Sequence, residues 1–348
     1  MCGHVALSAT GVPSAARYTA TRPPSTLAPT SAPSSISEAS HDQNWYAVCL
    51  ASEIDDGALV GANVLGGRVA VYRATDGTPV ALSATCPHMG ADLSLGEVFG
   101  DDVRCMFHYF RFGPDGVCTG IPSEDKVPRA ARVHSFAVAE RWGLIWIFNG
   151  PEPLCDPPGM RDYADDDIVV RARRTDLFPV EPWVIMANSY DYQHLRFVHG
   201  FEFAFDDTTV DWSVPYQIEE DMTMGLPDGA KIEQKIRTCG TNTVSYVTSG
   251  EIDSMGLFTS TPVPGGSQSY YIAATPDTRD GTPEQEAAVN ARLDAQETLA
   301  DFLLEDDTRA FTNMRFREGT FVGADRSLRK YFQWVKDFPK YDPSELFD

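Results

Sequence analysis

The chain has 348 residues, 43% of them hydrophobic, and its 28 Lys and Arg against 50 Asp and Glu leave a formal net charge of −22 at pH 7. Such a charge repels nucleic-acid phosphates and anionic membrane surfaces, which argues against nucleic acid as a partner. No run approaches the roughly 20 apolar residues that span a bilayer, so we expect no membrane span. A chain of this length can bury two modest cores, which predicts two domains.

Residues 1–42 are predicted to be a disordered, low-complexity tail. The first 37 residues contain no Asp or Glu, only Arg17 and Arg22 as strong bases, and five prolines among many Ser, Thr and Ala. This composition is typical of disorder and also of an organelle transit peptide, so both interpretations stay open. The seven scattered cysteines favour a reducing compartment. We therefore expect a cytoplasmic protein unless the tail is a transit peptide.

From Trp45 onward, short β-rich runs alternate with turn residues, which predicts a small antiparallel all-β domain. The expected strands are residues 45–50, 68–73, 80–84, 137–140 and 144–148. A stretch rich in Pro, Gly and Asp then runs from Gly150 to about Asp167 and cannot hold a strand ladder. We place the domain boundary in it, with the first domain at residues 43–155 and the second at residues 156–348.

The second domain has an α+β pattern. Residues 168–178 have β character, and residues 183–199 lack Gly and Pro and predict a helix. Four strands are expected at residues 231–237, 243–248, 256–261 and 269–274. A long helix begins at Thr282-Pro283-Glu284, where Pro suits the first turn, and a helix at residues 325–335 closes the chain. The expected fold is helix-grip-like, a curved antiparallel sheet with a long helix laid on it.

The first metal motif is Cys86-Pro87-His88 followed, after sixteen residues, by Cys105-Met106-Phe107-His108. Two thiolates and two imidazoles on paired loops suit a Rieske 2Fe-2S centre, in which one iron takes both Cys and the other takes both His. A tetrahedral zinc site uses the same residue types. However, zinc fingers usually place two to four residues between their cysteines and both histidines on a helix, so the spacing favours the iron cluster.

The two loops, residues 86–91 and 105–112, resemble the Rieske domain of the ring-hydroxylating oxygenase family. The Rieske proteins of respiratory complexes carry an additional cysteine in each loop, and neither loop has one here. The resemblance implies a Rieske 2Fe-2S cluster held by Cys86, His88, Cys105 and His108.

The second metal motif is Asn188, Asp191, His194 and His199. Histidines five residues apart lie about 140° apart on a regular helix, so both could bind one metal only where the helix ends or distorts. Gly200, the next residue, is of the type at which helices commonly end. The pattern resembles the catalytic-iron motif of the same family, which implies a mononuclear Fe(II) bound by His194 and His199.

Non-haem iron that activates O2 commonly takes two His and one carboxylate, so a distant acid is required. Glu305, Asp306 and Asp307 are the candidates. Helical phase places Asp307 on an apolar stripe, where a carboxylate is costly unless it binds a cation. The stripe consists of Ala300, Leu303, Leu304, Ala310, Phe311 and Met314. We predict Asp307, with Asp306 as the alternative because helix phase is uncertain by a residue or two.

The family resemblance also implies a head-to-tail homotrimer in which electrons cross between subunits. Asp191 would then link His108 of a neighbouring copy to His194 of its own chain. A local helix cap is the alternative for Asp191. Asn188 could approach the iron or simply stabilise the helix.

The resemblance implies the activity of the shorter, homotrimeric branch of the family, the monooxygenases and demethylases. These enzymes use O2 to hydroxylate, demethylate or desaturate a small organic substrate, which we expect to be cyclic. The sequence has no dinucleotide-binding Gly motif and no plant-type ferredoxin Cys run, so a separate NAD(P)H-dependent reductase or ferredoxin must supply electrons. Two alternatives are a Rieske electron carrier without oxygenase activity and a zinc-stabilised ligand-binding protein.

Overall fold

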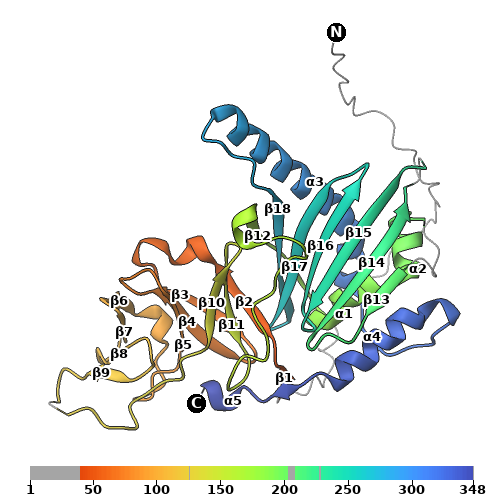
Figure 1. The fold of residues 1–348 in the computed structure, drawn as a ribbon. Coiled ribbons are helices and arrows are strands. Elements are labelled where there is room, and N and C mark those ends of the chain that lie inside the picture. The colour runs from red at the N-terminus through yellow and green to blue at the C-terminus, as the bar shows by residue number, and fades with distance from the viewer. Residues whose placement is uncertain (1–39, 125, 203–207, 227–228, 348) are drawn as a thin grey trace, which may run out of the picture. The chain divides into compact units, whose positions relative to one another are not determined.

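The computed structural model describes residues 40–347 except residues 125, 203–207 and 227–228 (Figure 1). The disorder predicted for residues 1–39 therefore lies outside the described residues. At the end of the predicted tail, the chain forms strand β1 (His41–Asp42), which pairs with β19 (Lys340–Tyr341) near the C-terminus. That part of the disorder prediction was wrong, because the partner strand comes from the far end of the chain and leaves no local signal.

The N-terminal half is all-β, as predicted. It contains three small sheets with the strand orders β10-β11-β2, β3-β4-β5 and β6-β7-β8-β9, all antiparallel. Its strands are β2 (Trp45–Leu50), β3 (Val60–Val64), β4 (Gly67–Arg73), β5 (Pro79–Ser83), β6 (Glu97–Phe99), β7 (Asp102–Arg104), β8 (Arg111–Phe112), β9 (Cys118–Gly120), β10 (Val138–Arg141) and β11 (Leu144–Phe148). The sequence missed β3 and β6 to β9, most of which are too short to show a period.

The C-terminal half is built on a seven-stranded antiparallel sheet with the order β12-β18-β17-β16-β15-β14-β13. Its strands are β12 (Ile168–Phe178), β13 (Thr208–Asp211), β14 (Gln217–Gly225), β15 (Lys231–Cys239), β16 (Thr243–Gly250), β17 (Ser254–Val263) and β18 (Gly266–Pro276). The sequence missed β13 and β14, although alternate residues along β14 are buried. The α+β prediction is confirmed.

The long helix α3 (Pro283–Asn313) packs on β18, β12 and β17 and lies along the sheet (Figure 1). It begins as predicted: the Thr282 side chain accepts a hydrogen bond from the Gln285 N–H, and Pro283 occupies the first turn. Val289 and Leu293 pack on Tyr271 and Ala273 of β18. The apolar face of α3 therefore fixes which of its side chains turn toward the sheet.

The helix predicted at residues 183–199 is broken into three pieces: α1 (Pro182–Met186), a 3-10 turn at Ala187–Tyr190, and α2 (Tyr192–Phe197). The break falls at Asp191, whose φ of −91° and ψ of 83° are not helical. The prediction of one continuous helix was wrong because the absence of Gly and Pro permits a helix without enforcing one.

The two halves share buried contacts within one compact unit of the chain. Trp45 and Trp146 of the N-terminal half lie in one core with Leu257 and Ile272 of the large sheet. The Thr261 hydroxyl also donates to the Ala47 carbonyl at 2.7 Å. These contacts hold the two halves against each other, while the boundary placed at residues 155–156 stays a prediction.

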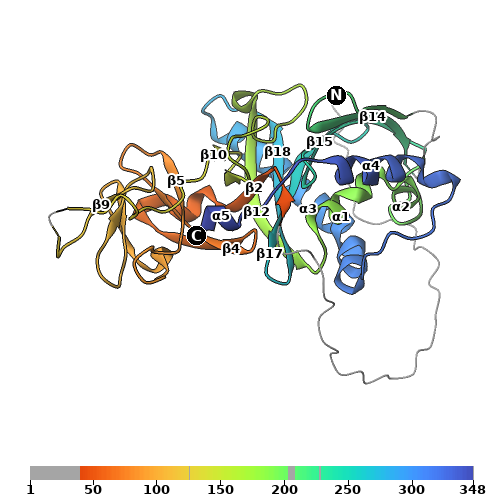
Figure 2. The same ribbon diagram turned by 90° about the horizontal axis from the view of Figure 1, so that it is seen from below.

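The chain does not close with the last predicted helix, α4 (Arg326–Asp337). It continues through β19 to a short helix, α5 (Ser344–Phe347), which lies against the N-terminal half (Figure 2). There Leu346 is buried in the same core as Val69 and Ile147. The C-terminal segment thus completes the core of the first half. Among the described residues, no helix combines the length and the apolar character needed to cross a bilayer.

Because Leu346 is 4% exposed in that core, Leu346→Ala is expected to lower the free energy of unfolding by about 2 kcal/mol or more. Urea denaturation followed by circular dichroism measures the change. Glu345→Ala, at the exposed neighbouring position, is the control and should change stability little. Equal effects of the two variants would show that the C-terminal helix does not stabilise this core.

Candidate metal centres and the cavity beside them

The loops that carry the first metal motif have the same backbone fold. In each loop the cysteine N–H donates to the carbonyl five residues later, and the N–H four residues later donates to the cysteine carbonyl. The bonds are Cys86 to Ala91 at 2.9 Å, Gly90 to Cys86 at 2.8 Å, Cys105 to Phe110 at 2.9 Å and Tyr109 to Cys105 at 3.1 Å. The turn residue has positive φ in both, 76° at Gly90 and 58° at Tyr109. The loops are thus two copies of one ligand-bearing turn.

These turns separate the two kinds of ligand. Cys86 and Cys105 are 2% and 1% exposed, whereas His88 and His108 lie on the exposed rim with ring centroids 4.6 Å apart. Burial raises the pKa of the Cys86 thiol to about 11, and the neighbouring Cys105 adds to the shift. An iron cluster that binds both sulfurs would replace these protons. An inner pair of Cys and an outer pair of His fit a two-iron Rieske cluster.

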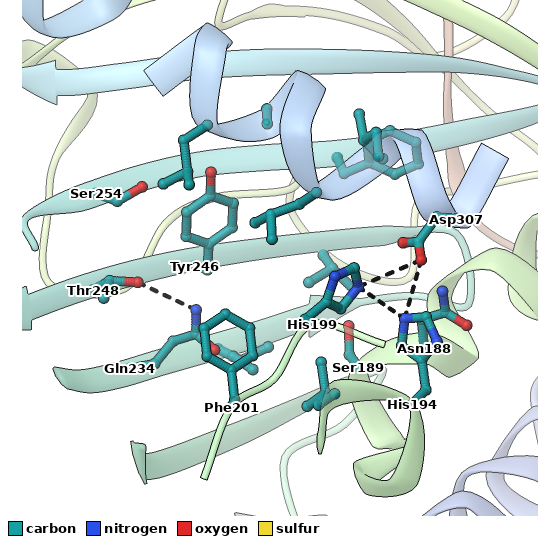
Figure 3. Close-up of a pocket in the computed structure, with 18 of the residues that line it drawn as sticks. Asn188, Ser189, His194, His199, Phe201, Gln234, Tyr246, Thr248, Ser254 and Asp307 are labelled. Carbon is teal, nitrogen blue, oxygen red and sulfur yellow. Dashed lines mark hydrogen bonds and ion pairs between the residues drawn. The ribbon is translucent and has the colours of Figure 1, made fainter. Parts of the chain in front are cut away.

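The second metal motif meets in space with a residue of α3. His194 lies on α2, His199 follows the end of that helix, and Asp307 reaches both from α3 (Figure 3). The two imidazole Nε2 atoms are 3.0 Å apart, and they lie 3.1 Å and 3.4 Å from Asp307 Oδ1. All three side chains are at most 13% exposed.

This geometry fits a metal ion. Ligand atoms about 2.1 Å from a metal and at right angles to each other lie about 3.0 Å apart, close to the observed separations. Asp307 Oδ1 is buried without a well-aligned hydrogen bond, although both imidazoles are near it. Burial alone would raise the pKa of Asp307, but the close polar contacts with His194 and His199 and their charges outweigh it and lower the pKa to about 2. The carboxylate is therefore ionised and poised to bind a cation.

Of the predicted acids, the structure brings Asp307 to the histidines, and Asp306 does not join it. Asp306 is largely exposed and lies 3.5 Å from Arg309. The predicted stripe was wrong at Ala310, which is exposed. Asp307 points inward because buried residues before and after it on α3, such as Ala300 and Phe311, determine which side of the helix faces the sheet.

Asp191 occupies the N-cap of α2, where its Oδ1 accepts a hydrogen bond from the His194 backbone N–H at 3.0 Å. This is the local cap that the sequence left as an alternative, and it positions the helix that carries His194. Asn188, one turn earlier, lines the cavity beside the histidines (Figure 3).

A cavity of about 250 Å³ opens beside the three side chains. Its walls come from α1, α3, the segment around α2, and the inner faces of β15 to β18, and most of them are apolar. Among the described residues, six polar side chains that the sequence did not indicate also line it: Ser189 next to Asn188, and Tyr271, Gln234, Tyr246, Thr248 and Ser254 on strands of the sheet. Figure 3 labels all of them except Tyr271. Strand alternation predicts which residues of a strand share a face, but it does not decide which face turns inward.

Next to this site, Glu220 of β14 is a buried carboxyl group, 1% exposed. The Tyr192 hydroxyl of α2 donates to its Oε1, while its Oε2 has no hydrogen-bond partner. Burial, helped by the charge of Asp221, raises the pKa of Glu220 from 4.5 to about 8 despite the Tyr192 hydrogen bond. Below about pH 8, Glu220 is therefore a neutral carboxylic acid, and in this form it accepts the hydrogen bond from Tyr192 of α2.

A family model described as "Rieske [2Fe-2S] domain" matches residues 44–136. Among curated proteins, the oxygenase component of 3-ketosteroid-9-alpha-monooxygenase from Rhodococcus rhodochrous is 38% identical over 116 residues, 33% of this chain and 30% of that protein. The toluene-4-sulfonate monooxygenase iron-sulfur subunit TsaM1 from Comamonas testosteroni is 32% identical over 181 residues, 51% of each chain. Cholesterol 7-desaturase from Bombyx mori is 33% identical over 167 residues, 46% of this chain and 36% of that protein.

Two solved structures share the fold over 85% of this chain. The Pseudomonas putida CBB5 NdmA QL mutant with theobromine has a TM-score of 0.65 and 20% identity over 90% of its own chain. Dicamba monooxygenase bound to dicamba has a TM-score of 0.58 and 20% identity over 96% of its own chain. The curated relatives, in contrast, are matched over about a third to a half of their length.

The chain therefore carries a Rieske 2Fe-2S domain, and the sheet-rich domain that follows it is part of the fold shared with these solved structures. The relatives include an oxygenase component and a monooxygenase iron-sulfur subunit, which fits the predicted resemblance to the Rieske non-haem iron oxygenases.

The raised pKa of Glu220 predicts a pH-dependent stability. The folded protein holds this proton up to about pH 8, whereas the unfolded chain loses it near pH 4.5. The contribution of Glu220 to stability therefore falls as pH rises between these values. Glu220→Gln should lose less stability than the wild type between about pH 5 and about pH 8 in urea denaturation. The exposed Glu233→Gln on β15 is the control, and an unchanged pH slope in Glu220→Gln would contradict the shift.

Proposed function

We propose that this protein is a Rieske oxygenase that uses O2 and electrons from a separate reductase to hydroxylate or demethylate a small organic substrate. The observation that carries the proposal is a two-histidine, one-carboxylate group beside an apolar cavity, in the same chain as a Rieske domain. The names of the relatives cover monooxygenase, N-alkylformylase and desaturase components, so desaturation is the alternative outcome. From cysteine usage, we place the protein in the cytoplasm.

We assign Cys86, Cys105, His88 and His108 as the ligands of the Rieske cluster, which supplies one-electron transfer at a potential above that of plant-type ferredoxins. The cysteines hold it from the buried side of the loops. The histidines present their rings at the surface, where a second protein can approach them. His88 is held in place by stacking on Phe110, with the ring centroids 4.7 Å apart.

We assign His194, His199 and Asp307 as ligands of a mononuclear Fe(II), which with this donor set keeps positions open for O2 and substrate. The chain contributes the surroundings. Ile185 and Phe311 help to line the cavity with apolar surface that excludes water, and Asn188 presents an amide beside the histidines. A substrate held in the cavity would be fixed next to the open side of the site.

We further propose a homotrimer in which electrons pass from one copy to the next through Asp191. Large apolar side chains around the Rieske histidines are more than half exposed, as expected of a surface that another protein covers. They are Met89, Met106, Phe107 and Tyr109. Asp191 is half-buried at the start of the helix that carries His194, where its carboxylate can also accept a bond from His108 of a neighbouring copy. A reductase or ferredoxin dependent on NAD(P)H would reduce the cluster.

The assignment predicts about three irons per chain, two in the cluster and one mononuclear. Asp307→Ala should retain about two irons and the Rieske spectrum but lose O2-dependent product. Iron analysis and product detection by mass spectrometry, with substrate candidates and a generic reductase, measure both effects. Asp306→Ala is the matched control and should keep all irons. Stoichiometric zinc without acid-labile sulfide in the purified protein would contradict the proposal outright.

Asp191→Asn separates the relay from the cap, because Asn also caps helices but carries no charge. We expect this variant to bind both metals, to fold normally and to lose turnover. Stopped-flow absorbance of the pre-reduced cluster, mixed with O2 and substrate, would show that the cluster no longer reoxidises at the wild-type rate. Wild-type reoxidation in Asp191→Asn would mean that the residue acts only as a cap.

A further inference from the structure

We propose that the substrate is an uncharged, largely apolar ring compound whose hydrogen-bond acceptor, such as a ring carbonyl, binds Gln234 and Thr248 at the end of the cavity away from the metal triad. The inference rests on the proposed function, since it assigns a ligand to the same cavity. Figure 3 shows the two parts: His194, His199 and Asp307 at one end, and the Gln234–Thr248 pair toward the other.

The charge of the cavity selects against ions. Among the described lining residues there is no Lys or Arg, and the metal triad holds the only Asp, Glu or His. Burial raises the pKa of the hydroxyls of Tyr246 and Tyr271, so both are neutral. A carboxylate or sulfonate at the end of the cavity away from the metal triad would leave water without a positively charged side chain as partner, which is costly. The cavity therefore suits a neutral molecule.

Most of the cavity wall is apolar. Ile232 and Ile236, on either side of Gln234 on β15, and Val244 of β16 line it from the sheet, and Leu303 and Phe311 of α3 line it from the helix. Ring compounds bury the most apolar surface for the least loss of conformational freedom in such a space. The body of the substrate would lie against these walls, with its acceptor on the polar pair.

Gln234 and Thr248 are directly opposite each other on β15 and β16, and Gln234 Nε2 donates to Thr248 Oγ1 at 3.2 Å. In this orientation the pair keeps one amide N–H and the threonine O–H unused. If the amide is turned over, the threonine donates to Gln234 Oε1 and both amide N–H groups are unused. Either way two donors remain, which can bind the two lone pairs of a carbonyl oxygen.

The other polar side chains that line the cavity from the sheet have partners already. The Tyr246 and Tyr271 hydroxyls are 2.9 Å apart, and Tyr271 donates to the Gln296 carbonyl at 3.4 Å. Ser254 donates to Gln296 Oε1 at 2.5 Å. These groups form a closed network between the sheet and α3. Asn188 and Ser189 lie beside the histidines, at the metal end of the cavity (Figure 3). An acceptor at the other end is therefore directed to Gln234 and Thr248.

Equilibrium dialysis with three probes of one ring system tests the proposal: 2-tetralone, tetralin and tetralin-2-carboxylate. The metal-loaded wild type is expected to bind 2-tetralone about tenfold more tightly than tetralin, the scale of one or two hydrogen bonds, and to bind the carboxylate least. Thr248→Val, which keeps the shape of the side chain, and Gln234→Leu should bind the ketone and the hydrocarbon equally. Ser254→Ala is the matched control and should keep the preference for the ketone.

Tighter binding of the carboxylate than of the ketone, or a ketone preference that survives in both Thr248→Val and Gln234→Leu, would overturn the assignment. The Rieske absorbance and the thermal melt of each variant confirm that it is folded. Dialysis needs neither an electron donor nor O2. A failure of the proposed function would therefore appear separately, as a missing mononuclear iron or missing O2-dependent product.

Discussion

The end of helix α2 at Phe197, before His199, is the constraint on which the candidate catalytic site depends. An unbroken helix would point His194 and His199 in directions about 140° apart. The chain instead starts a new helix at Tyr192, caps it with Asp191, and ends it before His199, where Gly200 has a φ of 73°. His199 is thereby free of the helical register and can turn toward His194.

The third side chain of the site depends on a different kind of support. Asp307 lies near the end of a helix that runs for 31 residues, and the direction of its carboxylate follows from how the whole helix lies on the sheet. Val289, Leu293 and Ala300 set that position by packing against Tyr271 and Ala273. The sheet that positions α3 also supplies the inner walls of the cavity, so the metal triad and the cavity are fixed by one packing arrangement.

The Rieske half reaches its geometry by local means. Each cysteine loop closes on itself with the same two backbone hydrogen bonds, and the turn residue has a positive φ in both. Gly90 adopts a positive φ without strain because it has no Cβ. Tyr109 adopts a positive φ because the other contacts of its loop hold it in this conformation. A second core of the N-terminal half is less local, because it is completed by Leu346 from the far end of the chain.

The sequence by itself determined the residue types and spacings of both metal motifs, the all-β and α+β character of the two halves, and most of the long strands, because these depend on local chemistry and periodicity. Helical phase even favoured Asp307 over Asp306. Only the tertiary structure decided that the helix breaks at Asp191, that β1 pairs with β19, and that Gln234 and Thr248 face the cavity. Each of these depends on partners distant in the sequence, and a strand's alternation is the same whichever face is turned inward.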